Sequence, residues 1–114
     1  MTIYDFNSWL GIKLGADGAT VEMEARAPEH QIGNGMVHLA VLTTLGEVAA
    51  AHAVDRPVVP TAVTANFLRP AVLGPLTAKG RVLSGGKRIV TAEGEVMSGG
   101  KLAAKVTVTF VVVG

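Results

Sequence analysis

Hydrophobic positions follow a helical period at the start of the chain and a period of two soon afterwards. Four apolar residues near the N-terminus stand at helical spacing, which predicts a short amphipathic helix. They are Ile3, Phe6, Trp9 and Leu10. From Gly11 onwards, apolar and polar residues alternate on both sides of Asp17-Gly18, a dipeptide typical of tight hairpin turns. We therefore expect two antiparallel strands, one over residues 12–14 and one over residues 21–27.

The middle of the chain predicts one long helix. Residues 37–54 are rich in Ala, Leu and Val and contain no proline, and this length and alanine content favour a helix over a strand. The segment is apolar on nearly every side, so we expect a sheet to bury it and to approach closely at small residues such as Gly46 and Ala50. Before it, residues 28–35 contain a proline, two glycines and no regular period, which predicts an irregular loop.

Four further segments with a period of two follow Pro60. They cover residues 61–69, 76–84, 89–98 and 101–113. Short breaks containing Gly or Pro separate them, so we expect hairpins that place these strands side by side in sequence order. The chain is then one α+β domain, residues 1–114, in which a curled antiparallel sheet of about six strands wraps one long central helix. Such a sheet leaves a face and its edges free for a partner subunit.

Composition and charge narrow the classes of function. With 49% hydrophobic and 17% charged residues, the 114-residue chain suits one buried domain and not a disordered segment. Ten basic and nine acidic residues give a net charge of +1, which does not favour nucleic acid as a partner. No cysteine and three histidines argue against a metal site. No apolar run approaches the roughly 20 residues of a membrane span, and no secretion signal is visible, so we expect a cytoplasmic protein.

The start of the long helix carries a motif. His38-Leu39-Ala40 opens the helix, and Glu47 follows nine residues after His38. Together with residues 66–71, 74–78 and 100–104, this stretch resembles the hotdog-fold acyl-CoA thioesterases of the phenylacetate-degradation type. The resemblance extends from about residue 28 to the C-terminus. It implies the hotdog fold, an acyl-CoA substrate, and an active site at a subunit interface in a homodimer or a dimer of dimers. The sequence has no convincing Gly-rich phosphate loop or pair of metal ligands, so we expect no cofactor.

Thioester hydrolysis needs a base or nucleophile on one side of the carbonyl carbon and hydrogen-bond donors for the oxyanion on the other. Glu47 is the only acid between Glu29 and Asp55. Because it lies in an apolar helix, we expect partial burial to raise its pKa, which suits a base; a surface ion pair is the structural alternative. The amides around Leu39 and Ala40, in the first helical turn, are the expected oxyanion donors.

The motif departs from the family at one position. The family has His-Gly-Gly, and Leu39 replaces the first glycine, whose amide usually contacts the thioester carbonyl. The amide survives this replacement, but a larger side chain could close the thioester pocket. An acyl-CoA thioesterase is therefore the first interpretation, and a hotdog protein that binds acyl-CoA or an acyl carrier without hydrolysis is the alternative. A hotdog dehydratase or hydratase comes last, because we find none of its catalytic motifs.

Several other polar residues have both a structural and a functional interpretation. His38 is expected to cap the helix through a ring nitrogen before acting as a base. Asn34, between two glycines, either orients water or adopts a positive φ in a turn. Thr61 and Thr64 begin the strand from which the family often supplies a hydroxyl for the attacking water. His52 is expected in the core or at an interface.

Basic residues on the later strands are candidates for the phosphates of CoA. Lys79 and Arg81 face Glu93 and Glu95 across a hairpin, so cross-strand ion pairs are the expected role of those two cations. The remaining candidates for the phosphates are Arg69, Lys87 and Arg88.

Overall fold

The N-terminal third of the structure is built from short elements that lead into one long helix. The computed structural model describes residues 6–114. The first elements are helix α1 (Phe6–Trp9) and strands β1 (Lys13–Leu14), β2 (Thr20–Ala25), β3 (Gln31–Gly33) and β4 (Met36–Val37). They are followed by helix α2 (Leu39–Ala53) and strands β5 (Val58–Phe67), β6 (Gly74–Gly85), β7 (Ile89–Ser98) and β8 (Lys101–Val112). The expected short N-terminal helix is present as α1, while Ile3 lies outside the described residues.

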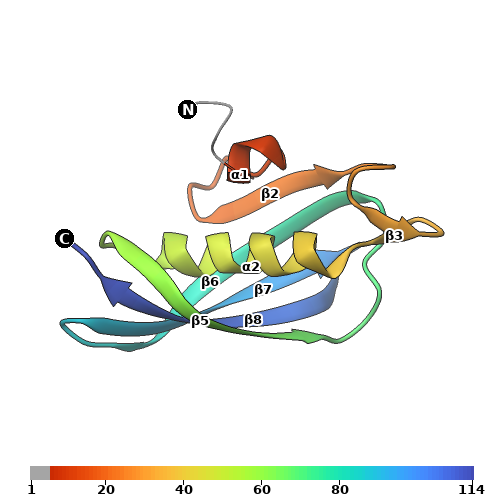
Figure 1. The fold of residues 1–114 in the computed structure, drawn as a ribbon. Coiled ribbons are helices and arrows are strands. Elements are labelled where there is room, and N and C mark those ends of the chain that lie inside the picture. Colours follow the sequence, from red (N-terminus) through yellow and green to blue (C-terminus); the bar gives the residue numbers. More distant parts are fainter. Residues whose placement is uncertain (1–5) are drawn as a thin grey trace.

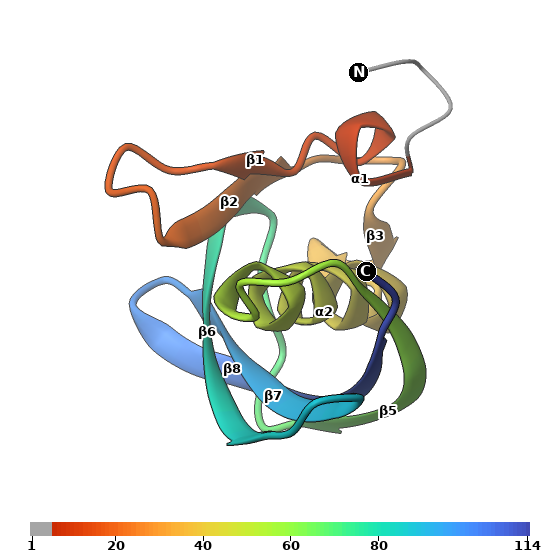
Figure 2. The same cartoon turned by 90° about the vertical axis from the view of Figure 1, so that its left-hand side faces the viewer.

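A six-stranded antiparallel sheet curls around α2 (Figure 1). Its strand order is β1-β2-β6-β7-β8-β5. Seen along the axis of α2, strands β7 and β8 pass beneath the helix, β6 runs down one side of it, and β2 lies above it (Figure 2). The expected α+β fold, with one long helix wrapped by a curled antiparallel sheet, is therefore confirmed.

The position of β5 differs from the sequence expectation. This strand pairs with β8, with Val63 opposite Val108, and not with β6, the next strand in the chain. Residues 68–73 form a crossing connection instead of a hairpin. Its middle residue Ala71 is buried, and the Ala71 carbonyl accepts a hydrogen bond of 2.9 Å from the N–H of Val37 just before α2. Burial of the connection against the helix start therefore separates β5 from β6.

The segment predicted as an irregular loop also contains regular structure. Strand β3 pairs with β4, with a bulge between Gln31 and Gly33. Asn34 and Gly35 link the two strands with φ angles of 52° and 73°. Two consecutive residues of positive φ allow the tight turn that connects antiparallel strands, so the prediction of a loop over residues 28–35 is wrong at this point.

Helix α2 approaches the sheet at glycines. A Cβ atom on Gly80 would overlap the backbone of Ala49, and one on Gly94 would overlap the backbone of Gly46. Gly46 in turn leaves room for the side chain of Val106. Because no other residue lacks a Cβ, these positions fix the distance between helix and sheet.

Candidate active site

Two histidines hold the start of α2. His38 is the N-cap residue, and its Nδ1 accepts a hydrogen bond of 2.9 Å from the N–H of Ala40, which confirms the predicted cap. The N–H of His38 donates to the carbonyl of His30 over 2.8 Å. His30 is buried, and its Nδ1 accepts from the N–H of Arg26 at 2.9 Å. Both rings therefore satisfy backbone groups, and the Ala40 amide, one of the expected oxyanion donors, is occupied.

The Leu39 amide is the donor that remains at the helix start. The next two amides in the helix, those of Ala40 and Val41, both donate to His38. Within residues 6–114, the Leu39 N–H donates no hydrogen bond. The positive end of the helix dipole lies at the same place. The Leu39 N–H is thus available to a carbonyl oxygen from outside the chain.

Glu47 lies two turns further along α2, on the same stripe as Leu39 and Thr43. Its side chain is half-buried, and this burial raises the pKa of the carboxyl above its ordinary value. In the described part of the chain, its carboxylate has no ion-pair or hydrogen-bond partner, so the alternative of a surface ion pair is not found. The Thr43 hydroxyl donates to the Leu39 carbonyl at 2.8 Å.

An apolar groove of about 460 Å³ opens beside Leu39. Its walls come from the β3–β4 hairpin, the first turn of α2 and the connection that follows β5. The apolar lining residues are Ile32, Met36, Val37, Leu39, Leu42, Phe67, Leu68, Pro70 and Ala71. Arg69 is the only charged residue of this lining. The groove therefore suits a hydrocarbon group.

Sequence reasoning identified Leu39 and Arg69 but missed the other residues of the groove. Ile32 and Met36 flank the Asn34-Gly35 turn, and both are exposed. Phe67 and Leu68 are also exposed at the end of β5. The sequence does show these apolar residues beside a turn and at the end of a strand. It does not show that the two pairs lie close together, because this depends on the path of the crossing connection.

The other catalytic candidates do not line the groove. Asn34 is exposed between β3 and β4 with a positive φ, which confirms its interpretation as a turn residue. Thr61 is exposed at a bulge in β5, and its hydroxyl donates to the Thr109 carbonyl at 3.2 Å. Thr64 is exposed on the same strand, opposite Thr107. None of these side chains is brought beside Leu39 within one chain.

Of the three cations proposed for the phosphates, only Arg69 lines the groove. Lys87 and Arg88 lie in the turn between β6 and β7. This turn is at the end of the molecule where α2 ends, whereas the groove is where α2 begins (Figure 1). Within one chain, Lys87 and Arg88 are therefore separated from the groove by the length of α2.

Four charged residues of β6, β7 and β8 form ion pairs on the face away from α2. Arg81 Nε lies 2.7 Å from Glu93 Oε1, which confirms the cross-strand pair predicted for Arg81. Lys105 Nζ lies 3.8 Å from Glu93 Oε2 and 3.5 Å from Glu95 Oε2. Lys79 stands opposite Glu95 in the register, but Glu95 forms its ion pair with Lys105 instead.

Of the two positions expected for His52, the core is wrong, and the interface stays a prediction. The side chain is exposed near the end of α2, and its Nε2 lies 2.9 Å from the carbonyl oxygen of Gly18. His52 faces the turn between β1 and β2, which reaches over the helix, and does not face the sheet.

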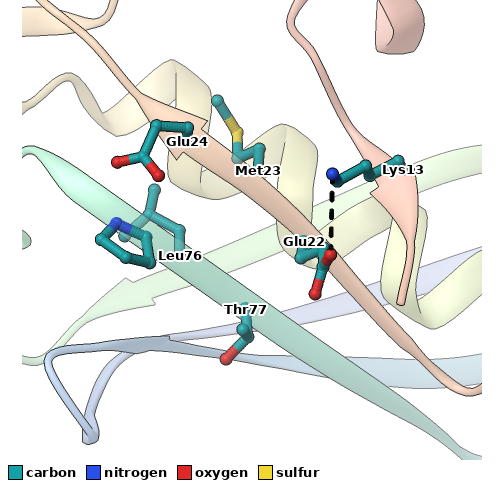
Figure 3. A pocket seen from close by; sticks show the side chains of 7 residues that line it. Lys13, Glu22, Met23, Glu24, Leu76 and Thr77 are labelled. Atoms are coloured by element: carbon teal, nitrogen blue, oxygen red, sulfur yellow. Dashed lines mark ion pairs between the residues drawn. The ribbon is translucent and has the colours of Figure 1, made fainter. Parts of the chain in front are cut away.

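A second hollow, of about 210 Å³, lies between β1, β2 and β6 (Figure 3). Its lining includes Glu22, Glu24 and Thr77, and Lys13 Nζ lies 4.0 Å from Glu22 Oε1. It shares no lining residue with the groove. Among the described residues, no group of three or more side chains could hold a metal ion, and no helix is long and apolar enough to cross a membrane.

Comparison with known proteins identifies the family. The family model of the acyl-CoA thioesterase N-terminal domain matches residues 26–111. The chain belongs to this family. No curated protein matches it. The chain is thus a thioester hydrolase of the acyl-CoA thioesterase class.

Solved structures agree with this assignment. A mutant of the phenylacetic acid degradation protein PaaI from Thermus thermophilus is 31% identical, with 95% of this chain and 98% of that chain covered and a TM-score of 0.83. The E. coli PaaI protein is 27% identical, with 95% and 83% covered and a TM-score of 0.83. The BH2602 protein from Bacillus halodurans with CoA shares the fold at 21% identity, with 100% and 80% covered and a TM-score of 0.82. The resemblance to hotdog thioesterases of the phenylacetate-degradation type is confirmed.

Proposed function

We propose that Glu47 is the general base of acyl-CoA hydrolysis and that the Leu39 amide binds the thioester carbonyl oxygen. The observation that carries this proposal is the half-buried Glu47 carboxylate, which has a raised pKa and no partner within residues 6–114. Raising the pKa of a carboxylate makes it a stronger base for a proton of water. The water oxygen then bonds to the carbonyl carbon, the C–S bond breaks, and the proton passes to the departing CoA sulfur.

The distance between the Glu47 carboxylate and the Leu39 amide limits how the two groups can act on one thioester. Glu47 is eight residues after Leu39 in the helix, which is about 12 Å along the axis. The side chain of Glu47 leans toward the helix start and shortens this distance, but both groups cannot contact one carbonyl directly. A water between the carboxylate and the thioester, or the equivalent carboxylate of a second copy, bridges the gap. Direct attack as a nucleophile is therefore open only to the carboxylate of the second copy.

A second copy is part of the proposal because β5 offers a pairing edge. This strand has ten residues and ends the six-stranded sheet as described. Its exposed side chains include Val63 and Phe67, and Phe67 also lines the groove. A long apolar edge strand favours pairing with another strand. We therefore propose a homodimer formed through β5, with a dimer of dimers as the larger assembly and the substrate at the subunit interface.

Each remaining candidate takes a role that follows from its position. We propose that Arg69 contacts a CoA phosphate, and that Lys87 and Arg88 contact CoA only when it is bound in the groove of a second copy. His38 positions the helix start. Asn34 and Thr61 have no step in the reaction within one chain.

The substitution E47Q tests the catalytic proposal. Glutamine keeps the size of the side chain and removes its basic oxygen, so kcat should fall by about a hundredfold or more with little change in KM. Thiol release from a panel of acyl-CoA thioesters measures both constants. The matched control is E24Q, at an exposed glutamate of β2 outside the groove.

Two results would contradict the proposal. Hydrolysis by E47Q at the rate of the parent would show that Glu47 is not the base. Binding of acyl-CoA by the parent without thiol release would favour the alternative of a binding protein, in which the Leu39 side chain closes the pocket.

A further inference from the structure

The Leu39 side chain lies beside the amide that we propose as the oxyanion donor. In a helix the Cα–Cβ bond tilts toward the N-terminus, so a side chain in the first turn leans over the helix start. The Leu39 side chain is 53% exposed and lines the groove together with Leu42 and Phe67. A thioester whose carbonyl oxygen is held by the Leu39 N–H therefore presents the first carbons of its acyl group to this side chain.

We propose that Leu39 narrows the groove next to the carbonyl and makes the thioesterase selective for acyl groups that are unbranched near the thioester. This inference rests on the proposed function, because it uses the Leu39 amide as the carbonyl donor. A straight chain needs only the width of one methylene group as it passes Leu39. A ring or a branch on the second or third acyl carbon needs the space that the Leu39 isobutyl group fills.

The chemistry of the groove fits the same class of substrate. Apart from Arg69, every residue of its lining is apolar. Apolar walls bind methylene groups through the hydrophobic effect and offer no side-chain partner for a hydroxyl group on the acyl chain. Both the apolar lining of the groove and the space left beside Leu39 therefore favour straight, unsubstituted acyl chains.

Pairs of thioesters with equal numbers of carbon atoms test the width directly. The pairs are octanoyl-CoA with phenylacetyl-CoA, and butanoyl-CoA with isobutanoyl-CoA. For each pair, we would measure the ratio of kcat/KM for the straight acyl group to kcat/KM for the branched or cyclic one. The parent should favour the straight member. L39A should lower the ratio by about tenfold or more, since even one methylene in a specificity pocket is worth that much.

Two further variants separate volume from other effects. L39M keeps the side-chain volume, so its ratio should stay within about threefold of the parent ratio. L14A removes the same atoms from a leucine of similar exposure, 50%, on β1 and outside the groove, and should not change the ratio. Equal losses of L39A on all four thioesters would overturn the inference, because they would assign Leu39 to the stability of the helix start. An unchanged ratio in L39A would also overturn it.

Failure of the proposed function can be distinguished from failure of this inference. If the parent hydrolyses none of the four thioesters, the proposed reaction is wrong for this chain. Dissociation constants of the same thioesters, measured by titration calorimetry, then replace kcat/KM. A tenfold change of their ratio in L39A supports the narrowing by Leu39, and an unchanged ratio overturns it.

Discussion

At the scale of single residues, Glu47 combines partial burial with the absence of a partner in the described chain. Burial disfavours the ionised form, so the pKa in the folded protein lies above that of the unfolded chain. The folded state then binds the proton more tightly, and its stability is greatest below the ordinary glutamate pKa and falls as the pH rises through the raised pKa. The same ionisation supplies the base, so hydrolysis should increase over the pH range in which Glu47 reduces stability.

The stability of E47Q tests whether ionised Glu47 destabilises the folded protein. At neutral pH the neutral amide avoids the burial of a charge, so Tm should rise by about 1–3 °C, a small effect because the side chain is only partly buried. Well below the ordinary glutamate pKa, where both side chains are neutral, the two Tm values should agree. Thermal denaturation at both pH values measures the difference. A lower Tm for E47Q at neutral pH would reveal a stabilising partner of the carboxylate.

The residue scale is also where the sequence was most informative. Glu47 stands alone among apolar neighbours, so its burial and raised pKa could be predicted from the chain. The cap at His38 could be predicted too, because capping depends on local geometry. The oxyanion donors could not be fully predicted, since the hydrogen bond that occupies the Ala40 amide depends on the orientation of the His38 ring. The surroundings of Leu39 also depend on contacts with distant segments.

At the scale of elements, backbone contacts between α2 and the sheet set the packing. Gly80 on β6 and Gly94 on β7 each leave space for a backbone segment of the helix. A methyl group at either position would meet main-chain atoms, which cannot rotate away as a side chain can. Overpacking against a rigid neighbour is among the costly changes in a protein core.

The substitution G94A should therefore destabilise the fold by about 3 kcal/mol or more, because its methyl group would overlap the backbone of Gly46. G85A is the control, as a Cβ there would meet the nearest atom, Val82 Cγ1, at 3.8 Å, which is ordinary van der Waals contact. Urea denaturation of both variants measures the free energies of unfolding. Equal stabilities would contradict the close approach of α2 to β7.

The elements themselves follow from the sequence more directly than their order does. Alternating residues predicted the later strands, and the long apolar segment predicted α2, which begins at Leu39 because Val37 belongs to β4 and His38 is the cap. The pairing of β5 with β8 could not be predicted from short breaks between strands. It depends on a buried crossing connection, and burial of Ala71 is a property of the assembled fold.

At the scale of the whole molecule, the exposed edge at β5 is where we propose that two copies associate. Val63 lies in the middle of this ten-residue strand and is 45% exposed. A lysine there would place a charge within the proposed contact, and the cost of removing its hydration would weaken pairing. The active site that we propose uses the same contact, so loss of pairing and loss of hydrolysis should occur together.

Sedimentation at micromolar concentration should show the parent as a dimer or tetramer and V63K as predominantly a monomer. V63K should also lose about tenfold or more in kcat/KM, because the proposed site needs a second copy. L14K, on the opposite edge strand β1, is the control and should keep the assembly and the activity of the parent. A fully active monomeric parent would contradict both the pairing and the shared site.

The two edge strands of the sheet are unequal in length, and this inequality has a consequence for the size of the proposed assembly. β1 has only two residues and carries Lys13, whereas β5 has ten. A chain with two open edges of similar length could add a neighbour at each and extend without end into a fibre. With one long edge, a single symmetric contact uses the edge of both chains, and strand addition stops at a closed pair. We therefore expect the short lysine-bearing strand to stop polymerisation and the long strand to form the contact of the proposed dimer.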